Sequence, residues 1–316
     1  MAVSLGAHIG QQNMTMDELR SLWRELDAAG LDWLSLWDHF YEAPPAGGKY
    51  DHFEAVAALG AMAADTSNAR LGCLVFYVGY RNPAMLAKAA VTLDHISGGR
   101  FELGIGGGWH EWEAEAYGYD FPSVGTRLRM LDDAAQLTRK LFDLPEGQRA
   151  DHSGEFYSLT NNSFLPAPVH RQLPLWIGGL GENKTLRTTA KYADGWNAAY
   201  VGPDKYAHLN GVLDRWCEAE GRDPASIERS VNLVFALGAD DAAAQEQLSL
   251  LEAEWGPMAE RVRAGTLQGT PDQAAEQVAA YIEAGADMVN IALRAPFDRD
   301  ALTAYVQDVV PVIRAS

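Results

Sequence analysis

The chain has 316 residues, a formal net charge of −18 and 47% hydrophobic residues. This acidic balance argues against nucleic acid or an anionic membrane surface as a partner, because both attract clustered basic residues. The two cysteines, Cys73 and Cys217, are too few for a disulfide framework and form no CxxC motif. The first ten residues do not read as a signal peptide, and no apolar run reaches the roughly 20 residues of a membrane span. We therefore expect a cytoplasmic protein.

Short apolar segments alternate with longer helical patterns along the whole chain. The expected strands are Val3–Ile9, Trp33–Trp37, Ala69–Phe76, Phe101–Gly106, Leu175–Gly178, Gly195–Ala199, Ser230–Leu237 and Met288–Leu293. The expected helices are Met16–Ala29, Phe53–Ala64, Ala84–Ile96, Arg127–Phe142, Asn183–Tyr192, Pro203–Glu220, Pro271–Glu283 and Arg299–Ile313. Eight β–α units predict a (β/α)8 TIM barrel in one domain spanning residues 1–316, with an open doubly wound sheet as the alternative.

Two regions are longer than an ordinary β–α unit, which predicts insertions after strands 4 and 7. Residues 109–162 contain turn residues and an expected hairpin around Gly154–Tyr157. Residues 239–269 contain an additional acidic helix. Extra segments that follow barrel strands usually cover or build the active site.

Active sites of TIM barrels lie at the C-terminal ends of the strands, so the residues found there are the first candidates. Asp38 and His39 follow the second strand, and histidine exchanges a proton near neutral pH. The alternative is that Asp38 caps a turn and His39 is an ordinary surface histidine. The third strand ends in the apolar residues Leu74 and Val75, which offer a flat wall rather than an acid or a base.

Glycines follow the fourth and fifth strands. Gly106, Gly107 and Gly108 are not part of a dinucleotide fingerprint, because Trp109 occupies the place of its last glycine. After the fifth strand, Gly178, Gly179, Leu180, Gly181 and Glu182 lead into a helix, where free backbone N–H groups and the helix dipole suit an anion. The alternative is that both clusters form tight turns.

Several segments together carry a family resemblance that extends over nearly the whole chain. They are Trp37–Phe40, Arg81–Pro83, Asp94–Arg100, Leu103–Trp109, Pro174–Gly179, Ala193–Asn197, Gly269–Asp272 and Gly285–Asp287. These segments resemble the luciferase-like monooxygenase superfamily, and most closely its branch that uses the deazaflavin coenzyme F420. The most specific of them is the SGGR-F-LGIG-G run, which begins at Ser97 and extends into the glycine segment Gly106–Gly108. The resemblance independently implies a TIM barrel.

The resemblance also implies where the cofactor would lie. A tricyclic ring would cross the barrel mouth, backed by a non-proline cis peptide at Leu74 and Val75. Gly106, Gly107 and Gly108 would leave room for the ring, and Asp38 and His110 would add contacts. The loop from Gly178 to Glu182 would hold the phosphate of the cofactor side chain.

His39 matches a functional histidine of similar deazaflavin dehydrogenases, so the resemblance implies that it acts as acid or base, with Asp38 orienting it. Some of these enzymes carry a proton-donating glutamate in the glycine segment, where this chain has Gly107. Glu111 is the acid we expect to act in its place, with Glu113 and His110 as the other candidates.

The expected function is hydride transfer between coenzyme F420 and a small organic substrate. The alternatives are an FMN-dependent monooxygenase that uses reduced flavin and O2, and a flavin-binding barrel without catalysis. A metal-dependent hydrolase fits worst, since the histidines show no H-x-H or H-E-x-x-H spacing, and no metal is expected. Aromatic residues near the strand ends favour an apolar substrate. The resemblance also implies a homodimer and a redox partner that regenerates the reduced cofactor.

Overall fold

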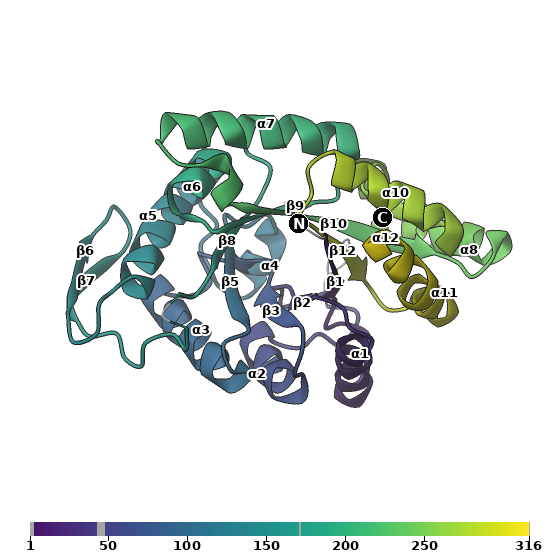
Figure 1. Ribbon diagram of the computed structural model, residues 1–316. Helices are drawn as coiled ribbons and strands as arrows, with labels where there is room; N and C mark the ends of the chain where they lie inside the picture. The colour runs from purple at the N-terminus through teal and green to yellow at the C-terminus, as the bar shows by residue number, and fades with distance from the viewer. Residues whose placement is uncertain (1–2, 43–47, 171, 316) are drawn as a thin grey trace.

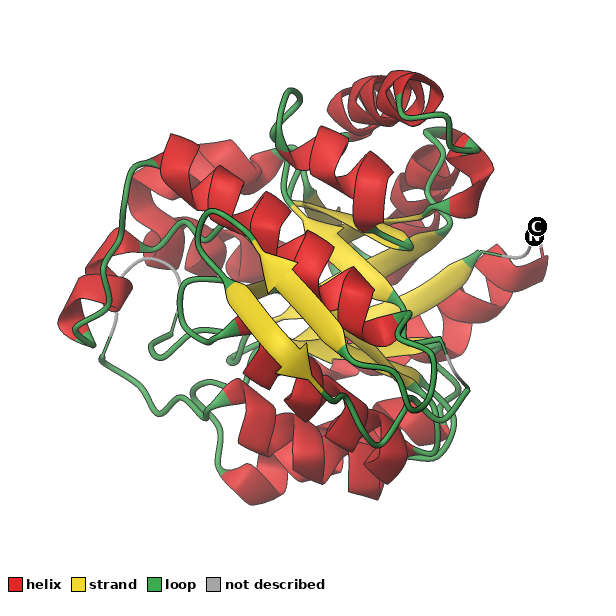
Figure 2. Ribbon diagram, turned by 90° about the vertical axis from the view of Figure 1, so that its left-hand side faces the viewer, coloured by secondary structure: helices red, strands yellow, loops and turns green. Residues whose placement is uncertain are grey.

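A closed parallel barrel forms the centre of the computed structural model, which describes residues 3–42, 48–170 and 172–315. Its strands are β1 (Ser4–Ile9), β2 (Trp33–Leu36), β3 (Arg70–Cys73), β5 (Phe101–Gly106), β8 (Leu175–Gly178), β9 (Gly195–Ala199), β10 (Glu228–Leu237) and β12 (Met288–Leu293). Each pairs with the next in this order, and β12 pairs with β1. The sheet therefore closes on itself, as the predicted TIM barrel requires, and the open-sheet alternative is wrong. Figure 2 shows helices packed around the strands.

Helices surround the barrel, and most begin at the caps that the sequence supplies (Figure 1). Thr15 and Glu18 form a capping box at the start of α1, and Pro83 occupies the first turn of α3 behind the Asn82 cap. The outer helices are α1 (Met16–Ala28), α2 (Ala55–Asp65), α3 (Pro83–Ser97), α5 (Val124–Phe142), α6 (Thr185–Tyr192), α7 (Pro203–Ala219) and α10 (Pro271–Glu283). The last expected helix is divided into α11 (Arg299–Ala304), a π-helical turn (Tyr305–Val309) and α12 (Val310–Ala315).

Two connections hold additional elements. The one after β5 contains α4 (Glu111–Ala116), α5 and a hairpin of β6 (Ala150–Ser153) and β7 (Ser158–Asn162), which Figure 1 shows at the outer edge beside α5. The one after β10 contains α8 (Asp241–Trp255), a 3-10 turn (Gly256–Met258), α9 (Ala259–Arg263) and β11 (Thr266–Gly269). β11 extends the sheet beside β10, and the sequence patterns did not predict it.

Two buried indoles fill the lower half of the barrel. The rings of Trp33 and Trp176 lie 5.5 Å apart, and both residues are almost completely buried. A Cβ atom on Gly72 would lie 2.6 Å from the Trp33 ring, and one on Gly195 would collide with Trp176. These strand positions therefore need glycine to admit the indoles. We call this pair of indoles the Trp33–Trp176 plug. It fills one end of the barrel, so the active site is expected at the opposite end, where the strands have their C-termini.

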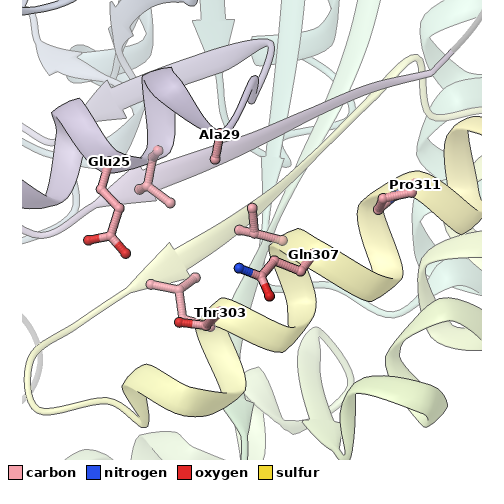
Figure 3. Close-up of a pocket in the computed structure, with 8 residues that line it drawn as sticks. Glu25, Ala29, Thr303, Gln307 and Pro311 are labelled. Carbon is pink, nitrogen blue, oxygen red and sulfur yellow. The ribbon is translucent and has the colours of Figure 1, made fainter.

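Outside the barrel, a hollow of about 370 Å³ separates α1 from α11 and α12 (Figure 3). Its lining combines apolar and polar side chains, namely Glu25, Leu26, Ala29, Leu302, Thr303, Val306, Gln307 and Pro311. Both cysteines are buried and unbridged. Within the described ranges, no helix is long and apolar enough to span a membrane, and no three metal-ligating side chains form a cluster.

Candidate active site at the barrel mouth

A histidine–glutamate pair lies at the C-terminal ends of the strands. His39 follows β2, and its Nδ1 atom lies 3.0 and 3.2 Å from the two carboxylate oxygens of Glu113 on α4. Glu113 is completely buried and also accepts hydrogen bonds from the Tyr80 hydroxyl at 2.7 Å and from the backbone N–H groups of Phe40 and Tyr41. The carboxylate therefore fixes both the His39 ring and the chain that follows it.

Electrostatics keep this carboxylate charged. Burial alone would raise the pKa of Glu113, but the hydrogen bonds from His39, Tyr80 and the Phe40 N–H outweigh it and hold the pKa at about 2. Because Nδ1 of His39 donates to this carboxylate, Nε2 is the ring nitrogen left to exchange a proton.

Asp38 occupies a different position from the one expected of an orienting residue. Its carboxylate accepts two hydrogen bonds from Arg81 Nη1, at 2.8 and 2.7 Å, and one from the Tyr77 N–H at 3.2 Å. Burial raises the pKa of Asp38, with Arg81 acting in the opposite direction. Asp38 thus ties β2 to the chain after β3, while the hydrogen bond to His39 comes from Glu113.

The two further candidates on the α4 segment also differ in placement. The side chain of Glu111 is exposed in the first turn of α4, so the structure brings Glu113 rather than Glu111 to His39. His110 caps α4, and its Nδ1 accepts a hydrogen bond from the Glu113 N–H at 3.3 Å. The His110 ring lies 5.8 Å from the His39 ring, and burial lowers the pKa of His110. His110 therefore sets where the helix that carries Glu113 begins.

The wall beside this pair contains the non-proline cis peptide expected between Leu74 and Val75. The Val75 side chain occupies the space that a side chain at Gly106 or Gly178 would need. A Cβ on Gly106 would be 2.5 Å from Val75 Cγ2, and one on Gly178 would be 2.8 Å from Val75 Cγ1. Glycine is therefore required at both positions to make room for the Val75 side chain. The sequence interpretation had assigned these glycines to the cofactor or to tight turns.

The remaining glycines of the mouth serve separate purposes. Gly108 has φ +67° and lies against the Tyr77 ring, so a side chain there would be both strained and blocked. Gly107 is the open position, because a Cβ there would meet only the end of Leu128, at 3.1 Å. Space for a ligand in this segment is therefore centred on Gly107.

The loop before α6 is held tightly. Gly179 adopts φ +136°, donates its N–H to the Asn197 carbonyl and accepts a hydrogen bond from Trp196 Nε1. A Cβ on Gly181 would lie 2.7 Å from Thr185 Oγ1, so the loop packs onto the first turn of α6. The N–H groups of a first helical turn have no intrahelical acceptors, which suits an anion.

The other two members of this loop are more exposed. Leu180 keeps 38% of its surface accessible. The Glu182 carboxylate pairs with Lys205 at 2.7 Å and His208 at 3.2 Å, both on α7. The Glu182 side chain therefore links the loop to α7, and its expected contact with a cofactor stays a prediction.

A second group of polar residues at the mouth was missed by the sequence interpretation. His8 on β1 lies 2.9 Å from Ser35 Oγ, and Trp37 Nε1 donates to His52 Nε2 at 3.1 Å. Arg294 follows β12, and its guanidinium carbon lies 4.5 Å from the centre of the Trp37 ring. The available signal was position at the C-terminal ends of the first and last strands, because His8 is the last residue but one of β1 and Arg294 directly follows β12.

A parallel barrel with a hydrogen-bonded histidine–glutamate pair at the C-terminal ends of its strands is typical of a TIM-barrel enzyme. The chain belongs to the luciferase-like monooxygenase family, whose sequence model matches residues 2–288, and it is an oxidoreductase.

Individual relatives agree with this assignment. The F420-dependent glucose-6-phosphate dehydrogenase of Kineococcus radiotolerans is 27% identical over 342 aligned residues, which cover 99% of this chain and 97% of that protein. A solved F420-dependent secondary alcohol dehydrogenase, in complex with an F420-acetone adduct, has a TM-score of 0.87 at 17% identity and covers 99% of both chains. The long-chain alkane monooxygenase LadA has a TM-score of 0.79 at 15% identity, over 100% of this chain and 92% of its own. The two structures show a shared fold.

Proposed function

We propose that this oxidoreductase transfers a hydride between coenzyme F420 and a small organic substrate. The observation that carries the proposal is the His39–Glu113 pair at the barrel mouth, beside the open position at Gly107. Similarity along nearly the whole chain to a protein named as an F420-dependent dehydrogenase adds support.

The residues at the mouth fit a planar ring with an anionic side chain. Leu74 and Val75 present an apolar wall, and Gly107 lacks the side chain that would fill the space opposite Leu128. The glycine loop before α6 offers backbone N–H groups to a phosphate. Asp38 is neutralised by Arg81, so it adds no unpaired negative charge beside such a ligand.

When bound, F420 would supply a carbon that accepts or returns a hydride. The chain would supply the proton at the substrate oxygen. In reduction, His39 would donate this proton from Nε2, and in oxidation it would accept it there. Glu113 would hold the ring in place through Nδ1, much as a buried carboxylate does for a catalytic histidine elsewhere.

A side-by-side titration of the purified protein with oxidised F420 and with FMN, followed by tryptophan fluorescence, tests the proposal. We expect tight F420 binding and weak FMN binding. The reverse result would favour the FMN-dependent monooxygenase, and binding without turnover of any alcohol or ketone would favour the non-catalytic barrel. The homodimer, the redox partner, the cytoplasmic location and the single-domain assignment of residues 1–316 stay predictions from the sequence.

A further inference from the structure

The guanidinium of Arg294 forms no direct ion pair with any carboxylate of the described residues. Its Nη2 atom donates to the Tyr200 hydroxyl at 3.1 Å, whereas Nε and Nη1 are buried without a hydrogen-bond partner. Within residues 3–42, 48–170 and 172–315, no acidic side chain lies within 4.0 Å of it. Buried charges in proteins are normally paired, and leaving one unpaired is costly. The arrangement therefore favours a role in ligand binding.

Aromatic rings surround this guanidinium. Its central carbon lies 4.5 Å from the centre of the Trp37 ring, 4.8 Å from that of Trp255 and 5.8 Å from that of Tyr200. Cation–π contacts stabilise a charge without using its N–H donors. The planar fork of donors thus stays suited to a carboxylate, which an arginine can bind through two parallel hydrogen bonds.

The neighbouring titratable groups do not compete for this role. Burial, with the charges of Arg294 and His39, lowers the pKa of His8 to about 3. Burial also lowers the pKa of His52, to about 4. Both imidazoles are therefore neutral at pH 7. Glu254 is the acid that interacts electrostatically with Arg294. Burial raises its pKa and Arg294 opposes this shift, but Glu254 forms no direct ion pair with the guanidinium.

We propose that Arg294 binds a carboxylate of the substrate, so that the substrate class is an apolar or aromatic carboxylic acid. This inference rests on the proposed function, because it names the substrate of the same mouth. Trp37, which packs on Arg294, stands two residues before His39 after β2, so a molecule anchored at Arg294 would reach toward the proton-exchanging pair. Trp255 ends α8, so the segment inserted after β10 contributes one wall of this subsite.

Benzoate and its neutral counterpart benzamide are suitable probes, and Trp37 and Trp255 report binding through their fluorescence. We expect the wild-type protein to bind benzoate at least tenfold more tightly than benzamide. Arg294→Gln should weaken benzoate binding at least tenfold and leave benzamide binding within twofold. Arg299→Gln is the matched control, because Arg299 is exposed and pairs with Glu25 between the outer helices. This control should bind benzoate like the wild type.

Equal affinity of wild type and Arg294→Gln for benzoate would overturn the carboxylate subsite, as would equal affinity of the wild type for the two probes. If Arg294→Gln does not fold, Arg294→Lys tests the proposal instead, because lysine keeps the positive charge but lacks the parallel N–H donors of the guanidinium. Benzoate binding should then weaken several-fold, and unchanged binding would overturn the proposal. The titration contains no F420. Failed benzoate binding with intact F420 binding therefore rejects the subsite alone, and the opposite pattern rejects the cofactor alone.

Discussion

At the residue scale, the hydrogen bonds that Glu113 accepts make its charge a source of stability. Its pKa lies at about 2 in the folded protein, below the ordinary value of 4.5. The stabilisation is therefore fully present above pH ~4.5 and is lost as the pH falls through ~2, and the shift corresponds to about 3 kcal/mol. We expect the free energy of unfolding to fall over this window by about that amount more in the wild type than in Glu113→Gln. Urea unfolding at several pH values measures it.

The same substitution should also affect catalysis, because a neutral amide accepts the hydrogen bond from His39 Nδ1 more weakly than the carboxylate does and orients the ring less firmly. We expect Glu113→Gln to lower kcat at least tenfold with the best alcohol or ketone substrate. Glu115→Gln, an exposed neighbour on α4, is the control and should behave like the wild type. Glu111→Gln discriminates between the two candidate acids. A lower kcat in Glu111→Gln, together with full activity in Glu113→Gln, would instead support Glu111 as the acid, as the sequence predicted.

Adjacent glycines of the mouth should respond differently to one added methyl group. Gly106→Ala would place its Cβ 2.5 Å from Val75 Cγ2 on a barrel strand, so we expect a loss of about 1–3 kcal/mol in unfolding free energy. Gly107→Ala meets only the flexible end of Leu128 and should change stability by less than about 0.5 kcal/mol. Gly107→Ala should instead weaken cofactor binding. Equal stability loss in both variants would contradict this division.

The sequence shows which residues lie at the ends of strands, but not which face of a helix points into the site. Position at strand ends was enough to find His39, Asp38 and the glycines. It could not choose between Glu111 and Glu113, because two residues apart on a helix means nearly opposite faces. Which of them faces inward depends on where α4 begins, which His110 sets by capping. Likewise, an arginine after a strand looks the same in the sequence whether it is exposed or enclosed, as Arg294 is, by aromatic rings.

At the scale of elements, one carboxylate attaches the β6–β7 hairpin to α5. Asp133 accepts hydrogen bonds from His152 Nε2 at 2.6 Å and from the N–H groups of Phe156 and Tyr157 at 2.6 and 3.1 Å. We expect Asp133→Ala to increase amide hydrogen exchange in residues 150–162 at least tenfold and to leave the barrel strands protected. Glu155→Gln is the control, because its exposed pair with Arg129 contributes little. Unchanged exchange in Asp133→Ala would show that other contacts hold the hairpin.

Element boundaries were predictable where strand and helix patterns are strong, and less so where tertiary contacts decide. The expected strand Ala69–Phe76 is interrupted at the cis peptide, and its end pairs separately as β4 (Phe76–Tyr77) with β5. β11 is short and becomes a strand because β10 offers it hydrogen-bond partners. A window of local sequence does not contain either partner, so neither feature could be read from it.

At the scale of the whole molecule, the barrel separates stability at one end from binding at the other. Arg70 is the first residue of β3, and it bonds to Glu102 at 3.2 Å and to Glu228 at 2.6 and 2.8 Å. Burial raises the pKa of Glu102, and Arg70 opposes this shift. Arg70→Met would leave the two glutamates together without a cation, beneath the Trp33 and Trp176 plug.

We expect Arg70→Met to lower the free energy of unfolding by about 3 kcal/mol, because it leaves the buried carboxyl of Glu102 without its cation. Affinity for the cofactor should change less than twofold in the folded variant, since the opposite ends of the strands form the mouth. Urea unfolding and an F420 titration of the same sample measure both quantities. Arg299→Met, which removes an exposed pair, should cost less than about 1 kcal/mol. A folded Arg70→Met protein that no longer binds the cofactor would show that the N-terminal end of the barrel also determines the geometry of the mouth. The proposed separation of stability and binding between the two ends would then be wrong.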